Sequence, residues 1–154
     1  MVSKIVGVTR SGSSPEVSVV MPCLNEAKTL TACIEHPDNF PRKQYSGEII
    51  IADNGSNDGS RVIAESMGAR VLSVSSRGYG SALMGGISAA LGRFVIMRDS
   101  DCSYDFRHIP RLLVKLRAGN DLVMGNRFLG GIKPGAMSPP HKYIGNPILT
   151  HGVC

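Results

Sequence analysis

Apolar segments of two lengths alternate along the chain. Short runs rich in Val and Ile alternate with longer stretches whose apolar residues recur every three to four positions, which are the patterns of buried strands and amphipathic helices. The patterns predict strands at residues 17–21, 48–52, 70–74, 94–97 and 121–124, and helices at residues 27–34, 60–67, 81–91 and 109–116. Strands of this kind separated by helices are typical of a parallel sheet covered on both faces, so we predict an α/β fold.

The first residues of the chain lack this pattern. They are polar and rich in Ser and Gly, which predicts a flexible leader at residues 1–15 and one folded domain at residues 16–154. A chain of 154 residues that is 42% hydrophobic is long enough for a single domain with a core.

Polar or glycine-rich clusters follow all five predicted strands. They are residues 22–26, 53–60, 77–80, 99–101 and 125–127. Ligands of open parallel sheets bind beyond the carboxyl ends of the strands, so these clusters belong together. Turn chemistry accounts for each cluster singly, but it does not require acids and arginines to gather at one edge. The set indicates a ligand site there.

Asp99 and Asp101 directly follow the predicted strand at residues 94–97. Residues two apart on an extended chain point the same way, so the two carboxylates would converge. Convergent carboxylates suit a hard divalent cation, and Mg2+ is typically shared between one or two carboxylates and the phosphates of a substrate. Asp-Ser-Asp also occurs in polar turns and at helix starts, where its side chains cap backbone donors.

Net charge limits the classes of binding partner, and cysteine content indicates the cellular compartment. A formal net charge of +5 favours an anionic partner such as a nucleotide, a lipid phosphate or a membrane surface. The basic residues are scattered and not interleaved with aromatic residues, which argues against nucleic acid. The four cysteines show no metal-site spacing, so we expect free thiols and a cytoplasmic protein, peripheral at the cytoplasmic membrane face. No apolar run approaches the roughly 20 residues that span a bilayer.

Five motifs in register resemble the inverting glycosyltransferases of family 2, which have the GT-A fold, and especially the branch of dolichyl- and polyprenyl-phosphate mannose and glucose synthases. The motifs are Pro-x-x-Asn-Glu at 22–26, Asp-x-Gly-Ser-x-Asp-Gly-Ser at 53–60, Arg-Gly-x-Gly at 77–80, Asp-x-Asp at 99–101 and Gly-Asn-Arg at 125–127. The resemblance runs from about residue 17 to residue 150. It implies a GT-A (nucleotide-diphospho-sugar transferase) fold with a Rossmann-like, mostly parallel sheet.

The resemblance also implies site residues. The implied catalytic residues are Asp99, Asp101 and Arg127, of which Asp99 and Asp101 would hold Mg2+ or Mn2+, and the implied substrate-binding residues are Pro22, Asn25, Glu26, Asp53, Arg77, Gly78 and Gly80. Asn25 and Glu26 equally suit a helix N-terminus, Asp58 suits a helix cap better than a ligand, and Arg127 also suits an ordinary surface position. The chain departs from the family's commoner Asp-Asp-Gly-Ser pattern at Asn54, which bears on the choice of nucleobase.

The implied reaction moves a sugar from a nucleotide-diphosphate sugar, of the UDP-glucose or GDP-mannose type, to an acceptor with inversion at the anomeric carbon. An acceptor hydroxyl needs a carboxylate base, whereas a polyprenyl phosphate is already anionic. The residues after Gly125 include cations and no acid, which favours a lipid-phosphate acceptor at a membrane surface and a role in cell-envelope glycan or glycolipid biosynthesis.

A second hypothesis is a truncated, inactive domain that binds a nucleotide sugar. Family members usually continue beyond the point that corresponds to Cys154, so we expect a domain incomplete at its C-terminus. Arg98 stands directly before Asp99, where it could pair with the carboxylate and weaken a metal site.

Overall fold

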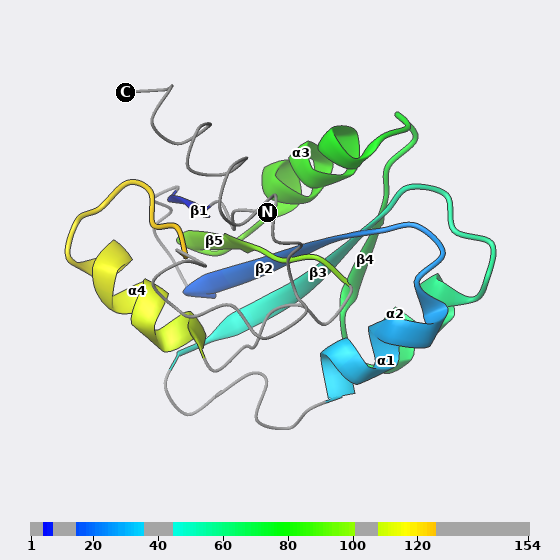
Figure 1. Cartoon of the computed structure of the whole chain (residues 1–154), viewed down its shortest axis with the longest axis horizontal. Coiled ribbons are helices and arrows are strands. Elements are labelled where there is room, and N and C mark those ends of the chain that lie inside the picture. The colour runs from blue at the N-terminus through cyan, green and yellow to red at the C-terminus, as the bar shows by residue number, and fades with distance from the viewer. Residues whose placement is uncertain (1–4, 8–14, 36–44, 101–107, 126–154) are drawn as a thin grey trace, which may run out of the picture. The chain divides into compact units, whose positions relative to one another are not determined.

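A five-stranded sheet forms the centre of the domain (Figure 1). The computed structural model describes residues 5–7, 15–35, 45–100 and 108–125. The strands are β1 (Ile5–Gly7), β2 (Val17–Cys23), β3 (Gly47–Asp53), β4 (Arg70–Ser73) and β5 (Phe94–Met97), in the spatial order β1-β5-β2-β3-β4. The helices are α1 (Ala27–Glu35), α2 (Ser60–Ser66), α3 (Tyr79–Ala89) and α4 (Ile109–Arg117). Strands β2 to β5 are parallel to one another, and β1 pairs with β5 in the antiparallel direction.

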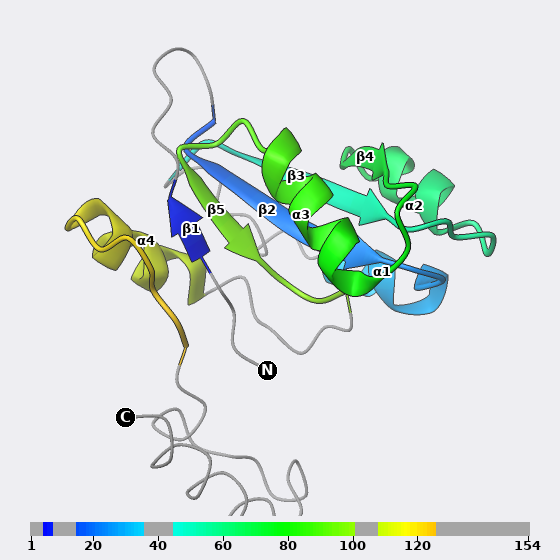
Figure 2. The same ribbon diagram turned by 90° about the horizontal axis from the view of Figure 1, so that it is seen from above.

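Helices cover both faces of the sheet, as predicted (Figures 1 and 2). Alternate residues of β2 point to opposite faces, so Val19 packs with the core side chains of α1, α2 and α4, whereas Val20 packs with those of α3. The central strand β2 is buried along its whole length. This burial explains why the strand is apolar apart from Ser18, whose hydroxyl donates to Glu48.

Two parts of the sequence prediction need correction. Residues 121–124 form no strand. The outer edge of β5 is instead paired with β1, so the backbone groups that another strand would bond there are already used. Strand β1 also lies within residues 1–15, for which no regular structure was predicted, because three residues are too few to show a pattern.

The described cysteines differ from each other. Cys23 is free and buried, and burial raises the pKa of its thiol. Cys33 is disulfide-bonded, so the expectation of free thiols is wrong for this residue. Sequence spacing does not reveal which cysteines a fold brings within bonding distance.

Within the described residues, no helix is both long and apolar enough to cross a membrane.

Polar contacts join the strands at the edge of the sheet where the parallel strands begin. The carboxylate of Glu48 accepts hydrogen bonds from Ser18 Oγ (2.6 Å) and Leu91 N (2.8 Å), and it pairs with Arg70 at 2.9 Å. Ser18 Oγ accepts in turn from Gly92 N at 2.8 Å. These contacts hold the end of α3 and the start of β5 against β2 and β3.

Gly92→Ala should destabilise the domain. A Cβ atom at this position would lie 2.5 Å from Ser18 N and 2.7 Å from Val17 C, which belong to a strand paired on both sides. We expect a loss of about 2 kcal/mol in the free energy of unfolding, measured by urea denaturation. Gly80→Ala is the control, because its Cβ would meet nothing within 4 Å. Equal urea midpoints for the two variants would contradict this close contact.

Candidate functional site

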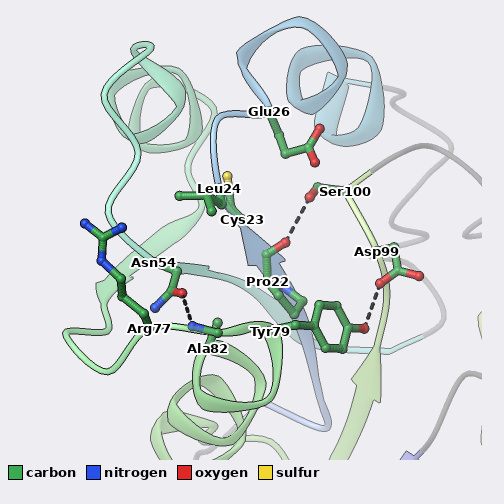
Figure 3. Close-up of a pocket in the computed structure, with 11 residues that line it drawn as sticks. Pro22, Cys23, Leu24, Glu26, Asn54, Arg77, Tyr79, Ala82, Asp99 and Ser100 are labelled. Carbon is green, nitrogen blue, oxygen red and sulfur yellow. Dashed lines mark hydrogen bonds between the residues drawn. The ribbon is translucent and has the colours of Figure 1, made fainter.

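A cavity of about 440 Å³ opens where the parallel strands end (Figure 3). Three strand ends and the first turn of α3 contribute its lining. The lining residues are Pro22 and Cys23 at the end of β2, Leu24 and Glu26 after it, Asn54 after β3, Arg77, Gly78, Tyr79 and Ala82 around the start of α3, and Asp99 and Ser100 after β5. Four of the five strand-end clusters of the sequence therefore contribute to one cavity; of the fifth, Gly125 does not line it, and residues 126 and 127 lie outside the described residues.

The predicted site residues divide into three groups. Those that line the cavity are Pro22, Glu26, Arg77, Gly78 and Asp99. Those that are described but do not line it are Asn25, Asp53 and Gly80. Asp101 and Arg127 lie outside the described residues, so their roles remain predictions. Sequence reasoning did not select Cys23, Leu24, Tyr79, Ala82 or Ser100.

The carboxylate of Asp53 accepts hydrogen bonds from the backbone of the turn that follows it. It is 1% exposed, and it accepts hydrogen bonds from Gly55 N at 3.2 Å and Ser56 N at 3.2 Å. Arg61 lies 3.9 Å away. These contacts stabilise the bend after β3 and leave the side chain outside the cavity.

The loops after β2 and β3 hold each other. Three successive backbone amides at the start of α1 donate to side chains of the other loop, namely Asn25 N to Ser56 Oγ (2.9 Å), Glu26 N to Ser60 Oγ (3.0 Å) and Ala27 N to Asp58 Oδ2 (2.9 Å). In return, Asn57 N donates to Asn25 Oδ1 at 2.9 Å. The amides at a helix start have no partner within the helix, so the second loop caps α1 from outside. This arrangement fixes Glu26 at the cavity and gives Asp58 a structural role.

The hydrogen bonds to Asp58 between the loops after β2 and β3 make the free energy of unfolding depend on pH. Hydrogen bonds from Ser60 and then from Ala27 lower the pKa of its carboxyl from 3.8. A carboxyl with a lowered folded pKa stabilises the fold above its unfolded pKa, and the stabilisation disappears as the pH falls through the folded value. We therefore expect Asp58→Asn to be less stable than the wild type at pH 6, with a difference that shrinks below about pH 4. Urea denaturation at several pH values measures this difference, and a gap that does not change with pH would contradict it.

Asn54 holds the loop that leads into α3. Its Nδ2 donates to Val74 O (3.0 Å) and Ser76 O (2.8 Å), and its Oδ1 accepts from Gly78 N (2.7 Å). The side chain uses its donors and its acceptor on one segment, which carries Arg77 to the cavity. The departure from the Asp-Asp-Gly-Ser pattern therefore has a structural reason, because a carboxylate cannot donate to the two carbonyls.

Asp99 and Arg98 point to different sides of the chain after β5. Asp99 Oδ1 accepts from the Tyr79 hydroxyl at 2.8 Å in the cavity. Arg98 is buried on the side of α1, where Nη1 donates to Cys33 O at 3.3 Å. Ser100 Oγ donates to Pro22 O at 2.9 Å and so joins the ends of β5 and β2. None of these contacts pairs Arg98 with Asp99, so they do not support the hypothesis that Arg98 weakens a metal site.

The donor atoms at the cavity fit a hard divalent cation. Asp99 offers carboxylate oxygens, and Glu26 adds a second carboxylate at the cavity wall, where it accepts from Thr29 Oγ1 at 3.0 Å. Among the residues that the structure describes, no three His, Cys, Asp or Glu side chains form a metal site of their own. Mg2+ and related ions need no such group when they are shared between one or two carboxylates and substrate phosphates. Arg77 adds a positive charge to the lining of the same cavity, and a guanidinium suits phosphate oxygens.

Known proteins resemble this chain in sequence. It is 41% identical over 142 residues to the low-salt glycan biosynthesis hexosyltransferase Agl6 of Haloferax volcanii, which covers 91% of the chain and 34% of that protein. It is 29% identical over 145 residues to a dolichol-phosphate mannosyltransferase of Mycosarcoma maydis, with 87% and 49% covered. The chain thus spans about a third to a half of the length of these relatives.

A solved structure shows the same fold. Glucosyl-3-phosphoglycerate synthase from Mycobacterium tuberculosis, crystallised with Mn2+, uridine diphosphate and glucosyl-3-phosphoglycerate, matches with a TM-score of 0.57 and 31% identity. The match covers 69% of this chain and 41% of the synthase. It confirms the GT-A fold, and residues 18–152 match the family described as glycosyl transferase family 2. The chain belongs to glycosyl transferase family 2.

Proposed function

We propose that the domain transfers a hexose from a nucleotide-diphosphate sugar to a polyprenyl phosphate, with inversion at the anomeric carbon and a divalent cation. The observation that carries the proposal is the meeting of Asp99 and Arg77 at one cavity beyond the ends of the parallel strands. A cavity with a carboxylate for a cation and a guanidinium for phosphate suits a diphosphate ligand.

The cavity residues would divide the work on the donor. Arg77 would bind a phosphate oxygen, and the backbone at Gly78, whose φ of 116° favours glycine, brings the start of α3 to the cavity. Asp99, together with Asp101, would hold Mg2+ or Mn2+. When bound, such a cation neutralises the charge that develops on the departing diphosphate. Pro22 and Leu24 would exclude water beside the nucleotide, because they form an apolar part of the wall.

The acceptor is proposed from the relatives and from charge. Two of the similar proteins are named a dolichol-phosphate mannosyltransferase and a dolichyl-phosphate hexose transferase. A phosphate oxygen is already anionic near neutral pH, so it can attack the anomeric carbon without a base. A net charge of +5 suits both the anionic acceptor and a peripheral position at the cytoplasmic face of a membrane.

The experiment incubates the full chain with UDP-glucose or GDP-mannose and Mn2+, with and without polyprenyl phosphate, and measures release of UDP or GDP. Release that requires both Mn2+ and the lipid phosphate supports the proposal. Donor binding that depends on Mn2+, without release, would support the second candidate, a domain that binds a nucleotide sugar and does not turn it over. If neither donor binds or reacts, the assignment of the cavity is wrong.

A further inference from the structure

Tyr79 is the first residue of α3, and its side chain crosses the cavity toward the end of β5 (Figure 3). Its hydroxyl lies 2.8 Å from Asp99 Oδ1. An ionised carboxylate only accepts hydrogen bonds, so the hydroxyl donates. The contact joins the start of α3 to the segment after β5, 20 positions apart in the sequence, and both side chains line the cavity.

The backbone directly before Tyr79 is held by the loop after β3. The residue before it, Gly78, donates its N–H to Asn54 Oδ1 at 2.7 Å, and Asn54 also bonds Val74 O and Ser76 O. Asn54 is only 9% exposed and its amide is held by three contacts. The start of α3 therefore has a fixed place relative to the sheet, and the phenol projects from this fixed point.

A donor at Oδ1 limits how the Asp99 carboxylate can turn. The carboxylate is attached through two rotatable bonds and is partly exposed, so the Tyr79 bond restricts its orientation in the cavity. One lone pair of Oδ1 is used, and the remaining lone pairs stay available to a cation. Groups that hold a metal-binding side chain in this way typically change metal affinity by 10- to 100-fold when they are removed.

We infer that Tyr79 is a positioning residue, whose hydroxyl orients Asp99 for a divalent cation bound together with the donor diphosphate. The inference rests on the proposed function, since it requires Asp99 to be a metal ligand. The role needs the hydroxyl and not the ring, which makes Tyr79→Phe the informative variant.

The test is a titration of the full chain with Mn2+ in the presence of UDP and, separately, of GDP, read from the electron paramagnetic resonance signal of free Mn2+. We expect Tyr79→Phe to raise the dissociation constant of Mn2+ about tenfold. Its thermal unfolding temperature should equal that of the wild type, because Tyr79 is 48% exposed. Ser88→Ala is the matched control, since it removes an exposed hydroxyl from the same helix.

The outcomes separate this inference from the proposed function. If Tyr79→Phe binds Mn2+ as tightly as the wild type while Asp99→Ala does not bind it, Tyr79 has no positioning role and the proposed function stands. If Asp99→Ala binds Mn2+ like the wild type, or the wild type binds none with either nucleotide, both the metal site and the role of Tyr79 are refuted.

Discussion

Asn54→Asp is expected to lower the free energy of unfolding by about 3 kcal/mol, although the two side chains have the same shape. The amide Nδ2 now donates to Val74 O at 3.0 Å and to Ser76 O at 2.8 Å. A carboxylate oxygen at that place cannot donate, and it carries a negative charge toward two carbonyl oxygens in a site that is 9% exposed. Only the bond from Gly78 N survives the substitution. Urea denaturation at pH 7 measures the loss.

Asn57→Asp is the matched control for this prediction. It makes the same chemical change on the same loop, but Asn57 is exposed and bonds Asn25 through its backbone N–H. The control should stay within about 0.5 kcal/mol of the wild type. At a pH at which the introduced acid is protonated, it can donate one hydrogen bond, so the defect of Asn54→Asp should narrow in acid. A defect no larger than that of Asn57→Asp would show that the Asn54 contacts contribute little.

The helices and most of the strands could be predicted because buried positions are apolar and recur along the sequence with the period of the element. β2 is buried on both faces and is apolar at every position except Ser18, whereas α4 repeats its buried residues Ile109, Leu113 and Leu116 at helical spacing. The strand predicted at residues 121–124 was wrong because the edge of β5 is occupied by β1. Which segment pairs with an edge is decided by the whole fold, and a three-residue strand gives no local signal.

The cavity could be predicted only in part, for a different reason. The rule that ligands lie beyond the ends of parallel strands brought Arg77 and Asp99 together correctly. The same rule cannot tell whether an acid faces a ligand or its own backbone, and the Asp53 carboxylate is used by the amides two and three residues later. Tyr79 was not predicted as a cavity residue, because the direction of its side chain depends on how the start of α3 packs against the sheet.

Asp99→Ala is expected to reduce Mn2+-dependent release of UDP or GDP by about 100-fold or more. The proposed cation, which stabilises the leaving diphosphate, would lose one of its ligands. The fold should be little affected. Asp99 is only partly buried, and the half-exposed Tyr79 that donates to it can bond to water instead. The measurement combines nucleotide release at several Mn2+ concentrations with the thermal unfolding temperature of the variant.

Asp121→Ala separates the loss of this carboxylate from the loss of a charge. Each substitution removes one carboxylate and raises the formal net charge above +5 by the same amount, but Asp121 is exposed after α4 and does not line the cavity. If the effect were general electrostatic attraction of an anionic donor, both variants would change release similarly. A specific role at the cavity requires that Asp99→Ala lose release while Asp121→Ala keeps it. Loss in both variants, or in neither, would refute the role of Asp99.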